Sequence, residues 1–322
     1  MTTNPPSPNL SRYVVVTPAR NEAHSVEQTI QSVVAQSVPP MKWIIVSDGS
    51  TDETDAIVSR YADRYDWIEL LRMPERTERH FAGKVLAFRA GFERVRQLPF
   101  DVLVSLDADL TFESDHFAFL LGKLAEDPAL GLVGTPFREL TGESYDYRFV
   151  SIEHVSGACQ VFRRACFESI GGYVPVKGGG IDHIAVISAR MKGWKTRTFT
   201  EKSCLHHRRM GTAQGGALSA RFRLGVKDYA IGNHPLWEAF RSVYQMTRRP
   251  LLLGGIALGS GYVWAGLHRN ERPVPRALTA FHRREQMQRL RRFFLRSGAQ
   301  PVEPRPPAGE NVAEPIRNPE RA

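Results

Sequence analysis

The sequence predicts an α/β fold in which a mostly parallel sheet is flanked by helices. Short apolar and β-branched runs alternate with segments of helical periodicity through the first third of the chain, and such alternation is typical of parallel sheets. Polar residues follow several of the expected strands. Because sheets of this kind bind ligands at the carboxyl ends of their strands, these polar residues are the first candidates for a site.

The expected elements follow one another along the chain. Four strands are predicted, at residues 13–17, 43–46, 67–71 and 102–106. Helices with apolar residues every three or four positions are predicted at residues 25–36, 52–61 and 83–96. Farther on, a short strand is expected at residues 195–198, with helices at residues 184–191 and 276–296.

Composition limits the classes of partner. The 322 residues are 42% hydrophobic and carry a net charge of +9, which favours a folded core and an anionic partner such as nucleotide phosphates or a phospholipid surface. Nucleic acid is not expected, because the arginines gather beside an apolar segment rather than among stacking aromatic residues. Three cysteines without a C-x-x-C pattern, Cys159, Cys166 and Cys204, indicate a reducing compartment. The polar, proline-rich residues 1–11 lack the apolar core of a signal peptide and are expected to be disordered.

The most informative pair of residues is Asp107 and Asp109, at the end of the apolar run 102–106. Side chains two positions apart on a strand lie on the same face, so both carboxylates could reach one ion. Mg²⁺ and Mn²⁺ prefer such oxygen ligands and commonly share them with substrate phosphates. The pair therefore predicts a divalent cation site at a strand end.

Two common phosphate-binding loops are absent, since neither G-x-G-x-x-G after the first strand nor G-x-x-x-x-G-K-[ST] occurs. A nucleotide-binding sheet without them needs a cation and side chains to hold a diphosphate. Lys84, which opens a helix after Gly83, suits this task because helix N-termini already favour anions.

These residues together resemble a family 2 glycosyltransferase with the GT-A fold, over residues 12–245. The segments that carry the resemblance are Thr17-Pro18-Ala19-Arg20-Asn21-Glu22, Val46-Ser47-Asp48-Gly49-Ser50-Thr51-Asp52-Glu53-Thr54, Ala82-Gly83-Lys84 with Gly91, Leu106-Asp107-Ala108-Asp109, Phe162-Arg163-Arg164, Ile170-Gly171-Gly172-Tyr173 and Gly180-Ile181-Asp182 ahead of Ala189-Arg190-Met191-Lys192-Gly193-Trp194. Their order and spacing make the resemblance specific.

The resemblance implies roles in holding a nucleoside diphosphate sugar. Pro18, Arg20 and Glu22 would hold its base and ribose, although Glu22 also suits a helix N-terminus. Asp48 would contact the base, and as an alternative it is simply a turn-forming residue. Lys84 would contact the diphosphate, unless it is one more surface lysine.

The resemblance also implies a bound Mn²⁺ or Mg²⁺. Asp109 would be the direct ligand, and Asp107 would reach the ribose or the ion. Many GT-A enzymes place a third ligand near the position of His206 and His207. Neighbours in an extended segment face opposite ways, so one histidine at most should bind, and His207 is preferred. The arginines that follow, Arg208 and Arg209, are candidates for diphosphate contacts.

Inverting sugar transfer needs a base for the acceptor hydroxyl, and a carboxylate suits this role. Asp182 matches the Asp of the family's Glu-Asp motif, although the preceding position is Ile181 instead of Glu. The glycines just before it, 178–180, suggest a mobile loop. As an alternative, Asp182 is a helix N-cap, in which case Glu153 and Asp146 are the next candidates for the base.

The C-terminal part has a different character. Residues 251–267 contain no charged residue, but the segment is short for a membrane span and rich in glycine. Residues 276–296 predict a basic amphipathic helix with Phe281, Met287, Leu290 and Phe294 on its apolar side. The chain is thus divided into a GT-A domain at 12–245, a membrane-associating helical extension at 246–296 and a disordered tail at 297–322. A buried helical hairpin is the alternative for residues 251–267.

The predicted function is inverting, metal-dependent transfer of one sugar from a nucleoside diphosphate sugar, with a UDP-sugar as the expected donor. The acceptor would be a hydroxyl of a lipid-linked or cell-envelope glycan precursor, and the enzyme would be cytoplasmic, peripheral at the inner face of the cell membrane. The Gln-x-x-Arg-Trp motif of processive synthases is missing, which favours single addition. A sugar nucleotidyltransferase, transfer onto polyprenyl phosphate and a binding-only glycosyltransferase are the alternatives.

Overall fold

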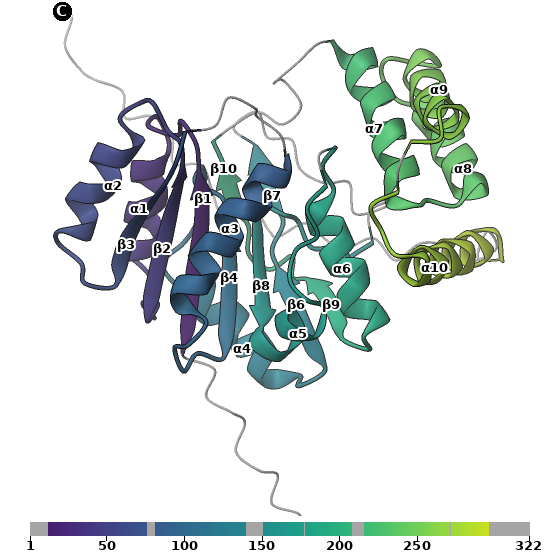
Figure 1. Cartoon of the computed structure of the whole chain (residues 1–322). Helices are drawn as coiled ribbons and strands as arrows, with labels where there is room; N and C mark the ends of the chain where they lie inside the picture. The colour runs from purple at the N-terminus through teal and green to yellow at the C-terminus, as the bar shows by residue number, and fades with distance from the viewer. Residues whose placement is uncertain are drawn as a thin grey trace, which may run out of the picture.

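A computed structural model describes residues 12–75, 81–139, 151–176, 178–207, 216–270 and 272–295, without the side chain of Phe81. It confirms the α/β fold. A mostly parallel sheet lies between two layers of helices, and a group of four helices lies beside one end of the sheet (Figure 1). The expected disordered ends, 1–11 and 297–322, lie outside the described residues, as do Asp146, Arg208 and Arg209.

The main sheet has seven strands in the order β3-β2-β1-β4-β8-β6-β9. Their bounds are β1 Tyr13–Ala19, β2 Lys42–Asp48, β3 Ile68–Met73, β4 Val102–Leu106, β6 Leu130–Gly134, β8 Cys159–Arg163 and β9 Lys195–Thr198. The neighbouring strands pair in parallel, except that β8 runs antiparallel to both β4 and β6. The predicted strands are therefore all present, and β8 is the one that breaks the parallel pattern.

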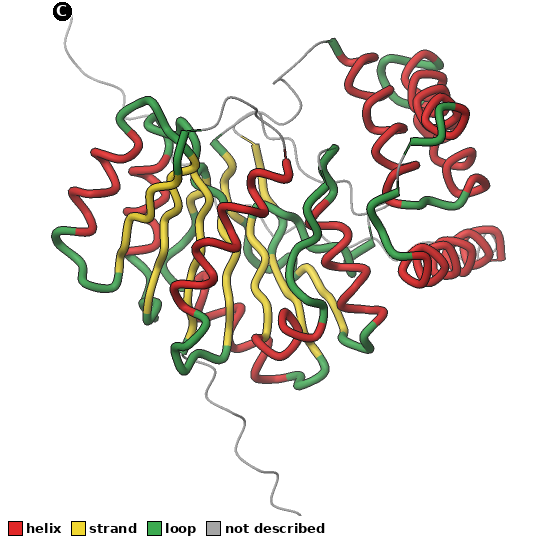
Figure 2. Tube along the Cα trace, viewed as in Figure 1, coloured by secondary structure: helices red, strands yellow, loops and turns green. Residues whose placement is uncertain are grey.

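Alternation along the strands divides the core between the two faces of the sheet. In β1, Tyr13 and Val15 belong to the core on one face, whereas Val14 and Val16 belong to the core on the other, as the two-residue period of a strand requires. The first core includes side chains of α1 Val26–Val34, α2 Thr54–Ala62 and α4 His116–Glu126, and the second includes those of α3 Phe81–Val95, α5 Arg164–Ser169 and α6 Ile181–Met191. Figure 2 shows the sheet between these two layers of helices.

A small second sheet lies at the carboxyl edge of the first. It has three strands in the order β5-β10-β7, namely β5 Leu110–Thr111, β10 Cys204–His206 and β7 Phe137–Glu139. In β10, His206 is paired with Leu110 of β5. The pairing brings a histidine beside the acidic turn that precedes β5.

The C-terminal helices are α7 Ala217–Ile231, α8 Pro235–Met246, α9 Leu253–Leu267 and α10 Arg276–Leu295. Glycines let α7 and α9 come into backbone contact: a Cβ on Gly225 would lie 2.0 Å from the Leu258 oxygen, and one on Gly261 2.0 Å from the Phe222 oxygen. The glycines of the apolar segment thus serve helix packing. Among the described residues, no helix is both long and apolar enough to pass through a membrane.

The predicted helix is present as α10, and one side of it packs on the rest of the protein. Its buried residues are Leu278, His282 and Gln286, and two of these three are polar. Phe281, expected on a membrane-facing side, packs against the core beside α6. The helix docks on the α/β domain through polar contacts, which residue hydrophobicity alone could not reveal.

Candidate nucleotide-sugar site

The carboxyl ends of three neighbouring strands form one edge of the sheet. The central strand is β1, where Ala19 is paired with Ser47 of β2 and Val16 with Ser105 of β4. The loop that follows β1, the turn after Asp48 and the turn that begins at Asp107 consequently lie side by side. This is the position at which open α/β sheets bind ligands.

Hydrogen bonds fix the loop after β1 to the turn after β2. The Thr51 amide donates to Asn21 Oδ1 at 2.8 Å, and the Glu22 amide donates to Thr54 Oγ1 at 2.9 Å. Asn21 has a φ of 55°, a conformation that asparagine tolerates better than most residues. The loop that presents Pro18, Arg20 and Glu22 is therefore preorganised.

Two acidic side chains of this edge are buried. Glu22 is 8% exposed and Asp48 is 6% exposed, and carboxylates are seldom buried this deeply in proteins. Asp48 precedes Gly49, whose φ of 67° allows the tight turn. The structure brings Pro18, Arg20, Glu22 and Asp48 to one edge, next to the acidic turn of β4.

The acidic pair itself lies in the turn after β4, not on the strand. β4 ends at Leu106 and β5 begins at Leu110, so the same-face argument from the sequence is wrong, and the turn brings the two carboxylates together instead. The amide of Asp107 donates to the Ala158 oxygen at 2.9 Å. Burial raises the pKa of Asp107, and the charge of Asp109 raises it further, against the opposing effect of Lys84.

Lys84 of α3 forms an ion pair with Asp107. Burial lowers the pKa of the Lys84 ammonium, but the charges of Asp107, Asp182 and Asp109 outweigh this effect and the net shift is upward. The lysine is therefore a permanent cation at the acidic turn. A glycine on the same helix, Gly91, lets α3 lie close to the sheet, because a Cβ there would be 2.6 Å from Val16 Cγ1.

His206, not His207, is the histidine beside Asp109. Its Nε2 lies 3.4 Å from Asp109 Oδ1, and the two side chains are 7% and 8% exposed. His207 points to Thr111, with 3.0 Å between Nε2 and Oγ1, while its amide donates to the Asp109 oxygen. Adjacent residues of an extended segment face opposite ways, and His207 directly follows β10, so the geometry favours His206 as the histidine of the acidic turn.

Asp182 reaches the site from α6. The N-cap of this helix is Gly180, with a φ of 86°, so Asp182 is not the cap residue but lies in the first turn. Gly157 packs directly under it, because a Cβ there would be 2.7 Å from the Cβ of Asp182. Its carboxylate is close enough to Lys84 to raise the pKa of that lysine, so the structure brings Asp182 together with the acidic turn.

Residues 14–151 match the model of the family described as "Glycosyl transferase family 2". Residues 14–151 thus form a segment of the glycosyltransferase family 2 type. The relatives include the Probable glycosyltransferase YdaM of Bacillus subtilis (strain 168), 30% identical over 150 residues, which are 45% of this chain and 34% of the relative. A poly-beta-1,6-N-acetyl-D-glucosamine synthase of Staphylococcus aureus (strain COL) is 29% identical over 117 residues, 36% of this chain and 26% of the relative. The chain thus spans about a third or less of the length of these relatives.

Solved structures share the GT-A fold of this glycosyltransferase domain. The mannosyltransferase PcManGT from Pyrobaculum calidifontis, in complex with GDP-Man and Mn²⁺, aligns with a TM-score of 0.54 at 19% identity, over 87% of this chain and 80% of that one. S. aureus TarS 1-349 in complex with UDP-GlcNAc aligns with a TM-score of 0.52 at 12% identity, over 81% of this chain and 74% of that one. At these identities the likeness supports the fold alone.

The donor set of the glycosyltransferase domain fits a divalent cation that is only partly held by protein. Asp107, Asp109 and His206 offer two carboxylates and an imidazole at one turn, and these are ligands that Mn²⁺ accepts. Within the described ranges, no three His, Cys, Asp or Glu side chains are grouped tightly enough to hold an ion alone. An ion here would need further ligands, such as substrate phosphates.

Two polar residues behind Asp182 were not predicted as part of the site. The Tyr173 hydroxyl donates to Gln160 Oε1 at 2.6 Å, and Gln160 Nε2 donates to the Val155 oxygen at 3.2 Å. Both side chains are buried. A glutamine within the apolar run of β8 was the feature of the sequence that could have revealed this pair.

Glu153, the described alternative to Asp182 as the base, is already paired, because its carboxylate accepts a hydrogen bond from Arg289 at 2.9 Å.

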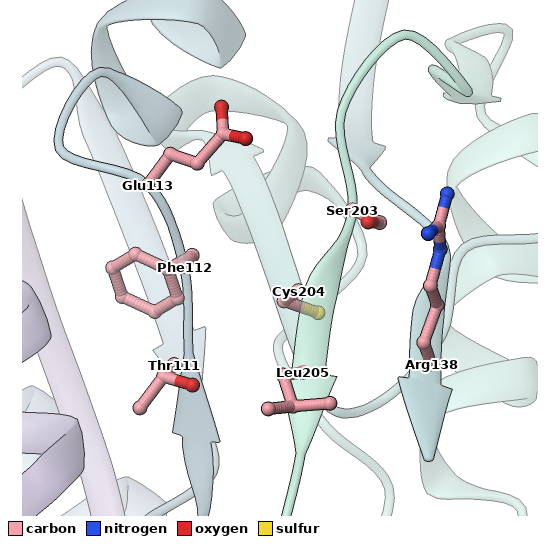
Figure 3. Close-up of a pocket in the computed structure, with 7 residues that line it drawn as sticks. All are labelled: Thr111, Phe112, Glu113, Arg138, Ser203, Cys204 and Leu205. Carbon is pink, nitrogen blue, oxygen red and sulfur yellow. The ribbon is translucent and has the colours of Figure 1, made fainter. Parts of the chain in front are cut away.

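A pocket of about 300 Å³ lies on the small sheet and is lined by Thr111, Phe112, Glu113, Arg138, Ser203, Cys204 and Leu205 (Figure 3). None of the predicted site residues lines it. Thr111, which contacts His207, is its link to the acidic turn.

Proposed function

We propose that the protein transfers a single sugar from a nucleoside diphosphate sugar to a hydroxyl acceptor, with inversion at the sugar. One observation carries the proposal: the turn with Asp107 and Asp109 lies between the buried acids of the β1 and β2 ends and the carboxylate of Asp182. Nucleotide-binding and base functions would thus meet at one edge of the sheet. The match to the family over residues 14–151 supports the nucleotide-binding part of this arrangement.

In this proposal the fixed loop of β1 binds the nucleoside. Asp48 would accept hydrogen bonds from the base, while Pro18, Arg20 and Glu22 would hold the base and ribose. A UDP-sugar is the proposed donor, and solved structures with the same fold contain UDP-GlcNAc or GDP-Man. Lys84 would contact the diphosphate, because its ammonium already stands at the acidic turn.

A divalent cation would be held by Asp107, Asp109 and His206. His206 is proposed in place of His207 because its Nε2 lies 3.4 Å from Asp109 Oδ1. When bound, such an ion supplies charge neutralisation at the diphosphate leaving group. Lys84 would add a second positive charge at the same place. Charge stabilisation of this kind is commonly the largest contribution to catalysis.

Asp182 would accept the proton of the acceptor hydroxyl as its oxygen attacks the sugar. The backbone oxygen of Asp182 accepts from Gln160 Nε2 at 3.4 Å, so Gln160 and Tyr173 would hold the first turn of α6 in place. A base favours a hydroxyl acceptor over polyprenyl phosphate, because a phosphate oxygen is already anionic at neutral pH and needs no deprotonation.

The acceptor is proposed to be a lipid-linked or cell-envelope glycan precursor, with the protein peripheral at the inner face of the cell membrane. The tip between α8 and α9 supports this. Leu251, Leu252 and Leu253 are 61%, 63% and 55% exposed, and they follow the exposed Arg248 and Arg249. Adjacent cationic and apolar side chains fit an anionic bilayer surface.

The backbone of the same tip is strained. Leu252 has a φ of 57° and a ψ of −55°, and the Leu253 amide donates to the Leu251 oxygen at 2.6 Å. This is a γ-turn of the rare kind, which is uncommon for a residue with a side chain. Strained residues of this sort cost about 1–3 kcal/mol and gather at functional positions.

Identification of the products tests the enzymatic proposal. The protein is incubated with Mn²⁺ and a panel of nucleotide sugars, and release of a nucleoside diphosphate is distinguished from release of pyrophosphate. Glycosyl transfer gives the former, whereas a sugar nucleotidyltransferase gives the latter. Asp109→Asn should abolish release and also the thermal stabilisation by donor with Mn²⁺, which for a ligand at 100 times its Kd is about 2.7 kcal/mol. Full activity in excess EDTA would exclude the metal-dependent mechanism.

A further inference from the structure

The first turn of α6, which carries Asp182, is covered by the C-terminal helices. The ring of His183, the next residue, packs against His282 of α10 with 5.3 Å between centroids and 78° between planes. On the other side, His183 Nδ1 lies 3.4 Å from His154 Nδ1. Gly180, just before the turn, packs against Ile231 of α7, since a Cβ there would be 2.5 Å from Ile231 Cδ1.

The far end of α6 is held by the same helix. Arg190 donates two hydrogen bonds to Glu285 of α10, at 2.7 and 2.9 Å. The two side chains are only 11% and 19% exposed, so this bidentate pair is far better shielded than a surface ion pair. Arg289, one turn farther along α10, pairs with Glu153 beside the site.

α10 is in turn fixed to the other C-terminal helices through Asn233, which lies between α7 and α8. Asn233 Oδ1 is 2.9 Å from His282 Nε2 and accepts from Gln286 Nε2 at 2.9 Å. Tyr262 of α9 donates to the backbone oxygen of Asn233 at 2.7 Å. The ring of His282, which contacts His183, is therefore itself held in place by Asn233 and Gln286.

The histidines of this contact are neutral at physiological pH. Burial lowers the pKa of His282 to about 3, and nearby arginines, first Arg190, lower it further. Burial likewise places the pKa of His183 far below its ordinary value, with His154 and His282 adding to the effect. The contact is thus one between two uncharged rings.

We propose that α10 positions Asp182 for proton transfer, with His282 and Glu285 as positioning residues that act through α6. Two separated contacts, His282 with His183 and Glu285 with Arg190, fix both the rotation of α6 about its axis and its displacement along it. A helix held only by its apolar side could still rotate by a small angle, and displacements of this size matter for reacting groups. This inference rests on the proposed role of Asp182 as the base.

Glu285→Gln tests the inference, because it keeps the shape of the side chain and removes the charge that binds Arg190. We expect kcat to fall about tenfold, within the ~100-fold that a 1 Å misplacement can cost, while KM for the donor and affinity for the nucleoside diphosphate stay unchanged. Glu168→Gln is the surface control, since Glu168 pairs with Arg164 at the same 2.7 Å on α5 but is 51% exposed and lies away from α10. The exchange Arg190→Glu with Glu285→Arg should restore part of the lost turnover.

A double-mutant comparison separates positioning from general destabilisation. In an Asp182→Asn background, Glu285→Gln should have no further effect on residual turnover, because a residue that acts through Asp182 has nothing left to position. An equal loss in both backgrounds would overturn the inference.

Hydrogen exchange gives a readout that does not depend on activity. The amides of residues 181–186 should exchange faster in Glu285→Gln than in the wild type, and Glu168→Gln should leave them unchanged. If the wild type turned over no nucleotide sugar, the proposed function would fail, while this exchange result would still decide whether α10 holds α6. Unchanged exchange together with unchanged kcat would overturn the positioning role.

Discussion

The two parts of the molecule use buried polar side chains in different ways. In the α/β domain, buried acids such as Glu22, Asp48 and Asp109 gather where strands end, at the edge where a ligand would bind. In the C-terminal helices, the buried polar residues Asn233, Glu238, His282 and Gln286 hydrogen-bond within their own group. Buried acids therefore indicate a ligand-binding site in the α/β domain, whereas buried polar residues in the C-terminal helices hold those helices together.

The largest effect that follows from this comparison is on turnover at the sheet edge. Asp182→Asn is nearly isosteric but cannot accept a proton, so donor binding should persist while kcat falls by roughly 10²- to 10⁴-fold. Steady-state kinetics with the best donor, together with donor-dependent thermal shifts, measure the two quantities separately. A turnover equal to that of the wild type would mean that the base lies elsewhere or that the acceptor is already anionic.

The sequence predicted features made by residues close together in the chain better than contacts between residues far apart in the chain. Strands β1, β2 and β4 and their polar ends follow from local patterns, so Asp48, Asp107 and Lys84 could be placed at one edge. The preference for His207 differs from the geometry, in which His206 lies beside Asp109, because the choice required the register of β10 against β5, which pairs His206 with Leu110. No local pattern specifies a pairing between segments this far apart.

The C-terminal helices were harder to predict for a related reason. Arginines and phenylalanines in residues 276–296 suggested a membrane surface, yet the partners of Glu285 and Arg289 are 95 and 136 residues away in the sequence. Likewise, the domain boundary expected at 245 falls at the end of α8, although α9 packs on both α7 and α8. Glycine at 225, 255 and 261 marks close helix contacts that a hydrophobicity pattern alone does not distinguish from a weak membrane span.

A smaller effect is expected on stability within the helical group. Glu238 is 2% exposed, and burial, followed by the charge of Asp228, raises its pKa to about 7 against the attraction of Arg241. The folded state then binds more protons than the unfolded state between pH ~4.5 and ~7. The free energy of unfolding should accordingly fall as pH rises through this window and level off above it.

Glu238→Gln should remove this pH dependence, which amounts to about 3 kcal/mol at most for a shift of this size. Denaturant unfolding of wild type and variant at pH 5 and pH 8 measures it, with Glu168→Gln as a surface control. The other groups that face Glu238 are Asn233, Arg241 and Asp228, and all three are kept in the variant. If the difference in unfolding free energy between the wild type and Glu238→Gln were the same at pH 5 and pH 8, burial of Glu238 would have no effect on its ionisation.

The smallest effect concerns the leucine tip, where the helical group would meet a membrane. Leu252→Gly removes an exposed side chain and relieves the positive φ of 57°, because glycine adopts such conformations without strain. Burial of a leucine side chain is worth about 1.5–3 kcal/mol, so the affinity for anionic phosphatidylserine vesicles should fall about tenfold or more. The thermal midpoint should at the same time stay level or rise.

A fall in vesicle affinity without a fall in the thermal midpoint distinguishes a membrane contact from a packing role. A leucine that stabilises the fold would lower the midpoint when replaced, whereas a leucine retained for a surface outside the protein would not. Leu86→Ser is the matched control, because Leu86 is an exposed leucine, at 43%, on α3 of the other domain, and its vesicle affinity should equal that of the wild type. Added salt should weaken binding of all three proteins, since Arg248 and Arg249 contribute a screened attraction. If Leu252→Gly bound vesicles as tightly as the wild type, the tip would not be the membrane contact, and a soluble acceptor would become the better proposal.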